Sequence, residues 1–261
     1  MNQERTLFVG WQDQSERRWY VVARLVKSTA VNGEHEYRFE YIRGAEEAAS
    51  KGFQPFVAFP KLEEVVRSRA LLPFFRNRVM PSSRPDYLSY LAQLGLEAPA
   101  EELAILARSG GQRTTERDEI EVFAPPMKRE DGTYETHFFV RGIRHLGATN
   151  VDVAGLRERE RLLCMLDLQN EFNRDAVILR TDRPERPILL GYVPDYLCHD
   201  VATLLKRDHV IRASVAKVND PGVPVQHRIL CRLELEPPSD YPFLSGPRFQ
   251  PLLKQSVSQA A

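Results

Sequence analysis

Short alternating runs of apolar and polar residues, broken by turn residues, dominate this sequence. Residues 5–13 (RTLFVGWQD) and 17–28 (RRWYVVARLVKS) alternate and are rich in β-branched and aromatic side chains, and residues 35–44 follow an Asn32-Gly33 turn signal. The alternation returns at residues 136–146, 175–181, 188–194, 209–220 and 227–236. A period of two places successive side chains on opposite faces of a strand. We therefore expect a fold built mainly from antiparallel sheets.

Helical spacing is confined to a few segments. Apolar residues recur with a helical period in residues 61–75 (KLEEVVRSRALLPFF) and in residues 84–95, which end at a glycine. A short helix is predicted within residues 99–111, before a Gly-Gly stop, and another within 194–208, where a proline stands at the start. Residues 157–168 fit a helix or a strand, and we favour a strand.

A proline pair and an Asp-Gly turn signal within residues 124–135 divide the chain. We predict an α+β protein with a mixed β/helical subdomain at residues 1–127 and a mainly β domain at residues 133–236. Residues 237–261 contain five prolines and are predicted to form an extended tail.

The composition limits the class of partner. The chain has 36 basic and 36 acidic residues, so its formal net charge is zero, which argues against a wholesale polyanion binder but leaves room for a local basic groove. No apolar run approaches the roughly 18 residues of a membrane span, and the N-terminus lacks an apolar core of signal-peptide length. We expect a cytoplasmic protein without a membrane partner. The separated cysteines, Cys164, Cys198 and Cys231, predict neither a zinc site nor a disulfide.

The segment QNEFNRDAVIL, residues 169–179, places five polar side chains within seven positions directly before a predicted buried strand. The sequence GYVP follows at residues 191–194 and leads into the predicted helix. Asn and Asp before a strand often bond backbone groups in a turn. The polar side chains of this segment can therefore stabilise a turn by bonding to its backbone, or they can bind a ligand.

The second half of the chain resembles the HIRAN domain. The resemblance rests on GIRH (142–145), the polar segment 169–179 and the run 191–205, and it spans about residues 137–218. It implies a small OB-like β-barrel with one or two helices, which grips single-stranded DNA at its 3′ end. The family motif usually reads Asn-x-x-Asp-x-Asn-Ala, and the Asp and Asn positions are exchanged in this chain.

The resemblance implies a role for each matching residue. Arg144 would meet phosphate or base, His145 would stack, and the two asparagines would lie at the terminal sugar and its hydroxyl. A neutral amide at Asn173 replaces the family's acidic acceptor, so the hydroxyl contact should be weaker, and His145-Leu146 replaces a frequent aromatic pair. The expected nucleic-acid-binding residues are Arg144, His145, Asn170, Phe172, Asn173 and Arg174.

The first half resembles the N-terminal subdomain of HipA-type kinases over about residues 6–123. The matching segments are RFEY (38–41), PFFRNR (73–78), LGL (94–96) and SGG (109–111). In such kinases this subdomain meets partner proteins. The chain has no GxxxxGK[ST] loop, HRD-like loop or DFG motif, so an interaction role follows more naturally than phosphoryl transfer.

A secondary basic patch is predicted in the first half. Arginines alternate there with Phe74, Phe75 and Tyr87, as in surfaces that track a phosphate backbone. The alternative is that the phenylalanines are core and that the arginines form a solvated face balanced by Glu63 and Glu64. The arginines are Arg67, Arg69, Arg76, Arg78 and Arg84.

No motif predicts catalysis. The six histidines are scattered without a metal-ligand spacing, and no nucleophile elbow is present. We expect a non-enzymatic protein without a cofactor or metal, which binds DNA ends or single strands in repair, restriction or phage defence. The alternative is a protein-interaction adaptor, or a regulator of a toxin–antitoxin-like or kinase partner, in which the DNA site is degenerate.

Overall fold

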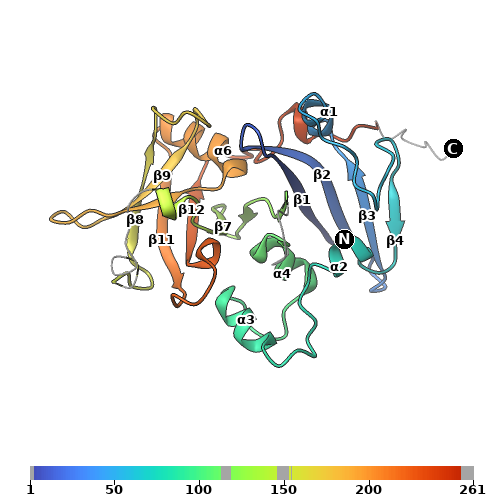
Figure 1. Cartoon of the computed structure of the whole chain (residues 1–261), viewed down its shortest axis with the longest axis horizontal. Helices are drawn as coiled ribbons and strands as arrows, with labels where there is room; N and C mark the ends of the chain where they lie inside the picture. The colour runs from blue at the N-terminus through green and yellow to red at the C-terminus, as the bar shows by residue number, and fades with distance from the viewer. Residues whose placement is uncertain (1–2, 113–118, 146–152, 154, 254–261) are drawn as a thin grey trace. The chain divides into compact units, whose positions relative to one another are not determined.

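The computed structural model describes residues 3–112, 119–145, 153 and 155–253. These residues group into two compact units that interleave along the chain (Figure 1). The first unit comprises residues 1–78, 112–123 and 245–261, and the second comprises residues 79–111 and 124–244. The grouping describes compactness only, and the predicted module boundaries stay a prediction.

The first unit is a five-stranded antiparallel sheet with the order β4-β3-β2-β1-β5. Its register places Leu25 of β2 opposite Leu7 of β1 and Phe39 of β3, so that apolar side chains align on one face. The strands are β1 (Gln3–Asp13), β2 (Arg18–Thr29), β3 (His35–Tyr41), β4 (Val66–Ser68) and β5 (Ile120–Phe123). The helices are α1 (Gly44–Ala49), α2 (Pro73–Arg76) and the 3-10 turn η3 (Pro247–Phe249).

Aromatic rings fill the core of this unit. Phe39 stacks on Phe59 with ring centroids 3.8 Å apart, and Phe75 is fully buried beside them. The Tyr41 hydroxyl donates to the carbonyl of Phe59 at 2.8 Å and accepts from the backbone N–H of Phe56 at 2.7 Å. The buried hydroxyl is thus satisfied, and the loop after α1 is fastened to β3.

The helical spacing read in residues 61–75 gave a wrong prediction. The segment forms only the short strand β4 and the start of α2, because pairing with β3 overrides a weak local preference. Pro73 occupies the first turn of α2, where its missing N–H costs nothing. The residue before a proline avoids the helical region, so Leu72 ends the extended segment, with ψ 139°.

The second unit contains a seven-stranded antiparallel sheet with the order β10-β9-β8-β11-β12-β7-β6. The strands are β6 (Met127–Lys128), β7 (Tyr134–Phe139), β8 (Arg161–Leu166), β9 (Val177–Thr181), β10 (Leu189–Tyr192), β11 (Val210–Val218) and β12 (Ile229–Glu236). The helices are α3 (Tyr87–Gln93), α4 (Glu102–Ser109), α6 (Asp195–Lys206) and the 3-10 turns η1 (Ile143–His145) and η2 (Val225–His227).

The sheet closes on itself just after β7. The backbone N–H of Arg141 donates to the carbonyl of Tyr192 at 2.9 Å, and the N–H of Tyr192 donates back at 2.7 Å. This bridge joins the end of β7 to β10, at the opposite edge, and makes the sheet barrel-like. Helix α6 adds Leu197, Val201 and Leu204 to the enclosed core. The α+β class with a small barrel is confirmed.

Two motif glycines lie at this closure. Gly191 has φ 149°, and a β-carbon there would lie 2.3 Å from the carbonyl oxygen of Arg141. Gly142 has φ 68°, and a β-carbon there would lie 3.0 Å from the ring of Tyr192. Both positions need glycine, because a side chain would prevent the close approach of the two backbones. The glycines of GIRH and GYVP therefore serve the barrel closure.

The predicted helices at residues 84–95 and 99–111 correspond to α3 and α4. Leu91, Leu94 and Ile105 from this helical pair pack on Phe139 and Leu230, on the outer face of β7 and β12. Helix α4 ends at a left-handed glycine, as the Gly-Gly stop predicts. Within the described part of the chain, no helix combines the length and apolarity needed to cross a membrane.

A candidate nucleic-acid interface

The polar segment forms the connection between β8 and β9. Asp167 donates its backbone N–H to the carbonyl of Ala176 at 2.9 Å, and Ala176 donates to the carbonyl of Asn173 at 2.9 Å. The loop therefore starts and ends on one pair of neighbouring strands. Its polar side chains then hold the backbone between these points.

Asn170 fixes the first part of the loop. Its carbonyl Oδ1 accepts the backbone N–H groups of Phe172 at 3.1 Å and Asn173 at 3.0 Å. Its amide Nδ2 donates to Oδ2 of Asp167 at 3.2 Å. A carbonyl oxygen has two lone pairs, so the Asn170 oxygen is fully used inside the loop.

Asn173 fixes the second part. Its Oδ1 accepts the backbone N–H of Asp175 at 2.8 Å, and its Nδ2 donates to Oδ1 of Asp195, in the first turn of α6, at 2.5 Å. Asp175 contacts the same helix through His199 at 3.0 Å and Lys206 at 2.9 Å. Burial opposes ionisation of Asp175, but these hydrogen bonds outweigh it and lower its pKa. The loop is thereby anchored to α6.

Asp167 ties the loop to the barrel closure. Its Oδ2 accepts from the hydroxyl of Tyr192 at 2.9 Å, and the hydrogen bond from Asn170 is the main cause of a lowered pKa at Asp167. Tyr192 pairs with Arg141 at the barrel closure, and η1 begins two residues after Arg141. The backbone N–H of His145, in η1, donates to the carbonyl of Gly142 at 2.9 Å. Three parts of the chain therefore meet at one edge of the barrel, and together we call them the rim. They are residues 142–145, residues 167–175 and Tyr192.

Four of the six predicted side chains point to solvent from the rim and have no hydrogen bond, ion pair or ring contact with the described residues. They are Arg144, His145, Phe172 and Arg174. The Phe172 side chain is 63 % exposed, which is unusual for a phenylalanine. Glu171, also exposed, is an acidic residue in the same loop as Phe172 and Arg174. The rim therefore exposes two arginine side chains and a phenylalanine ring, while the backbone of the loop that carries Phe172 and Arg174 is already hydrogen-bonded.

The structure thus brings all six predicted residues to one rim, but in two groups. Four are exposed, whereas Asn170 and Asn173 are half-buried and hold the loop. Their predicted contact with a terminal sugar stays a prediction. Sequence reasoning missed Asp167 and Tyr192 as members of the rim. Tyr192 belongs to GYVP, which gave no sign that its hydroxyl meets a strand end 25 residues earlier.

The predicted secondary patch is divided between the two units. Arg67 forms an ion pair with Glu36 and Arg84 with Asp86, and Arg78 lies over the ring of Phe74 at 4.9 Å. Arg84 belongs to the second unit, and the other four arginines belong to the first. Arg69 and Arg76 are exposed without a partner among the described residues. The patch stays a prediction.

No metal cluster is found in the described ranges, where no group of three or more His, Cys, Asp or Glu side chains is arranged to hold an ion. Cys198 and Cys231 are buried and Cys164 is half-buried, and all three are free thiols. Burial raises the pKa of Cys198 to about 12. A thiol with so high a pKa is a poor nucleophile at neutral pH.

Two solved structures show a low similarity to this chain. A protein from Lactobacillus plantarum matches with 18 % identity and a TM-score of 0.32, covering 40 % of this chain and 97 % of that one. The HIRAN domain of human HLTF matches with 13 % identity and a TM-score of 0.29, covering 41 % of this chain and 79 % of that one. No family model matches the chain, and no curated protein matches it. The likenesses are distant, so we base the function on the rim residues themselves.

Proposed function

We propose that the rim binds single-stranded nucleic acid, with a DNA 3′ end as its ligand, and that the protein acts by binding and not by catalysis. One observation carries the proposal. Two arginines, a histidine and a phenylalanine are exposed and make no side-chain hydrogen bond, ion pair or ring contact with the described residues, on a rim whose loop is held by its own hydrogen bonds.

The chemistry of these side chains suits a single strand. Arg144 and Arg174 can each contact a phosphate, and the Phe172 ring can stack on a base, a contact worth about 1–3 kcal/mol. His145 offers a second flat face. Because Asn170 and Asn173 hold the loop before any ligand arrives, little conformational entropy is lost on binding.

The two asparagines differ in what they can still accept. Both lone pairs of the Asn170 oxygen are engaged, whereas the Asn173 oxygen accepts one hydrogen bond from the described residues, which leaves its second lone pair for a ligand. We infer that a terminal 3′-hydroxyl donates to Asn173, while Asn170 acts as a positioning residue. A neutral acceptor gives a weaker contact than the family's carboxylate would.

A second candidate is supported by the apolar side chains near the rim. Leu168 is 79 % exposed, in the same loop as Phe172, and Met165 on β8 is 42 % exposed. Exposed apolar side chains that gather on one surface are typical of protein docking sites. In that case the protein is an adaptor, and its first half docks on a partner as the HipA resemblance implies. The setting we propose for either function is DNA repair, restriction or phage defence.

Fluorescence anisotropy of labelled oligonucleotides tests the proposal. The ligands are a single strand with a free 3′-hydroxyl, the same strand with a 3′-phosphate, and a blunt duplex, each at low and moderate salt. We expect the free 3′ end to bind most tightly, and the Arg144→Ala variant to bind about tenfold more weakly with a salt slope smaller by about 1.

Asn173→Ala and Asn170→Ala separate end recognition from loop support. Asn173→Ala should remove the preference for the free hydroxyl while general single-strand binding persists. Asn170→Ala should weaken all ligands alike, because it loosens the loop. Equal weak binding of every ligand, unchanged in Arg144→Ala, would contradict the proposal and favour the adaptor.

A further inference from the structure

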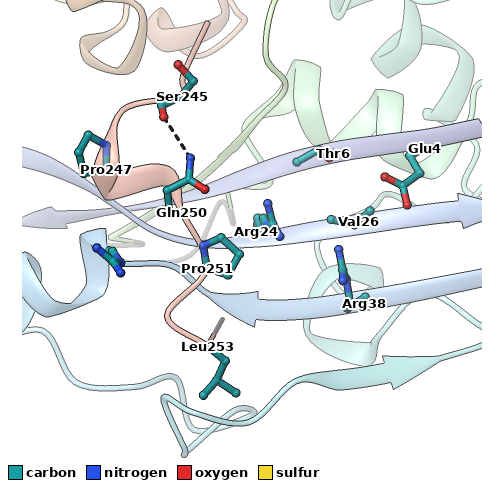
Figure 2. A pocket seen from close by; sticks show the side chains of 11 residues that line it. Glu4, Thr6, Arg24, Val26, Arg38, Ser245, Pro247, Gln250, Pro251 and Leu253 are labelled. Carbon is teal, nitrogen blue, oxygen red and sulfur yellow. Dashed lines mark hydrogen bonds between the residues drawn. The ribbon is translucent and has the colours of Figure 1, made fainter. Parts of the chain in front are cut away.

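The first unit contains a groove that the proposed function does not use. It has a volume of about 990 Å³ and lies between strands β1–β3 and the C-terminal segment (Figure 2). Three arginines line it, Arg24 on β2, Arg38 on β3 and Arg43 after β3. Its volume is at the upper end of the range of small-molecule sites.

One buried carboxylate serves two of these arginines. Glu40 is only 3 % exposed, and its Oε1 accepts from Nε of Arg24 at 2.6 Å. Nη2 of Arg38 lies 3.6 Å from the same oxygen. The two guanidinium side chains are 21 % and 17 % exposed, so they are held in place and partly desolvated. One carboxylate neutralises only one of the two charges.

The third arginine, Arg43, differs from the other two. The side chain of Arg43 is exposed, and it makes no hydrogen bond or ion pair with the described residues. Glu4 also lines the groove, but its Oε1 accepts from the hydroxyl of Ser28 at 3.1 Å. Three arginines against Glu4 and Glu40 leave one net positive charge (3 − 2 = 1).

The C-terminal segment gives the groove a fixed wall. Pro251 forms a bridge with Ile42, and the backbone N–H of Arg43 donates to the carbonyl of Gln250 at 2.9 Å. Phe249 packs edge-on against Phe8 of β1, with ring centroids 5.4 Å apart. The wall is therefore present before a ligand binds. Figure 2 shows Gln250 and Pro251 beside Arg24.

We propose that this groove binds a small molecule that carries phosphate, such as a nucleoside diphosphate. Guanidinium groups bind phosphate oxygens in pairs, and they do so most strongly where they are preorganised and partly desolvated. Arg24 and Arg38 are oriented by Glu40, and Arg43 is free to close on the ligand. Val26 and Pro251 supply an apolar surface for the remainder of the molecule. A single net charge and a wall on one side suit a small ligand better than a polyanion.

Isothermal titration calorimetry of the whole chain with pyrophosphate and with ADP tests the proposal at constant ionic strength. We expect saturable binding of both probes. Arg43→Gln should weaken it about tenfold or more, because it removes a charge-assisted contact without touching the backbone hydrogen bond to Gln250. Arg17→Gln is the matched control and should bind as the wild type does, because Arg17 is an exposed arginine of the same unit whose side chain makes no hydrogen bond or ion pair with the described residues.

Hydrogen exchange locates the site independently of any variant. Pyrophosphate should slow exchange in residues 38–43 and 245–253, which flank the groove. No saturation by either probe would overturn the proposal, as would an Arg43→Gln affinity equal to that of Arg17→Gln. A single-stranded oligonucleotide that displaces pyrophosphate would assign the groove to nucleic acid and overturn the small-molecule ligand. Arg144→Gln should leave pyrophosphate binding unchanged, so the rim and the groove are tested separately.

Discussion

The rim of the second unit and the groove of the first unit both present arginines, but they hold them differently. In the rim, the polar groups of the loop are hydrogen-bonded to one another, and Arg144 and Arg174 form no ion pair with an acidic side chain in the part of the chain that the structure describes. In the groove, Arg24 is bound to a buried carboxylate, Glu40. Removing a rim arginine should therefore change binding alone, whereas disturbing the groove pair should also change the free energy of unfolding.

The barrel closure is the most sensitive point of the rim scaffold. Gly191→Ala would place a β-carbon against the carbonyl oxygen of Arg141 at a backbone φ that alanine avoids. We expect the free energy of unfolding of the second unit to fall by at least about 3 kcal/mol. Hydrogen exchange in urea measures this loss in β9 and β10.

The matched control is Gly222→Ala, where nothing lies within 4 Å of an added β-carbon and φ is not positive. It should change the same free energy by less than about 0.5 kcal/mol. Equal effects of the two substitutions would show that the closure does not support the rim.

The groove pair is the next most sensitive point. Glu40→Gln leaves the partly buried Arg24 guanidinium without its counter-charge, and we expect a loss of about 2–3 kcal/mol in the first unit. Both tryptophans of the chain, Trp11 and Trp19, lie in this unit, so urea unfolding followed by tryptophan fluorescence reports on it.

Glu36→Gln is the control on the same strand, since Glu36 pairs with Arg67 at the exposed surface. Such pairs contribute about 0–1 kcal/mol. If the Glu40→Gln variant were as stable as Glu36→Gln, the buried carboxylate would not stabilise the groove arginines, and the contrast with the rim would fail.

A lower pH should destabilise the second unit through protonation of His137. Burial, with a contribution from Arg108, lowers the pKa of His137 to about 4 in the folded protein. The unfolded chain takes up a proton near pH 6.5 and the folded chain does not, so stability is present above pH 6.5 and is lost as the pH falls toward 4. For this group the loss between pH 7 and pH 5 is about 2 kcal/mol.

Urea-induced loss of far-UV ellipticity at the two pH values measures this effect. The His137→Gln variant lacks the titrating group, so its stability should fall by about 2 kcal/mol less than that of the wild type. A wild type and variant with the same pH dependence would rule out His137 as the source. His227, whose pKa is also lowered by burial, contributes in the same direction in both proteins.

The strands could be predicted from the sequence because alternation is a local property. The runs at residues 5–13, 17–28 and 209–220 all became strands, since their apolar faces match the sheet they join. The strand preferred at residues 157–168 also formed, as β8. The helical period of residues 61–75 failed where a non-local strand pairing competed with it.

The rim could be predicted only in part. The polar segment indicated where the loop lies. The alternative role, in which polar side chains hold the turn by bonding to its backbone, is the one that Asn170 has, through its hydrogen bonds with Phe172 and Asn173. The link from Asp167 to Tyr192 and the bridge at Arg141 depend on residues far apart in the chain. The groove depends on residues 245–253 returning to β3, and no local pattern in that proline-containing tail indicates this return.

The most direct test of the account compares two double variants with the same change of charge. Arg144→Gln/Arg174→Gln removes the rim arginines. The control, Arg17→Gln/Arg159→Gln, removes two exposed arginines outside every proposed site, whose side chains make no hydrogen bond or ion pair with the described residues. Anisotropy with one single-stranded oligonucleotide, over a range of salt concentrations, measures the affinity of each. We expect the rim variant to bind about 100-fold more weakly, with a salt slope smaller by about 2. The control should bind nearly as the wild type does, and both variants should keep full stability. Equal losses of affinity in the two variants would contradict a nucleic-acid site on the rim.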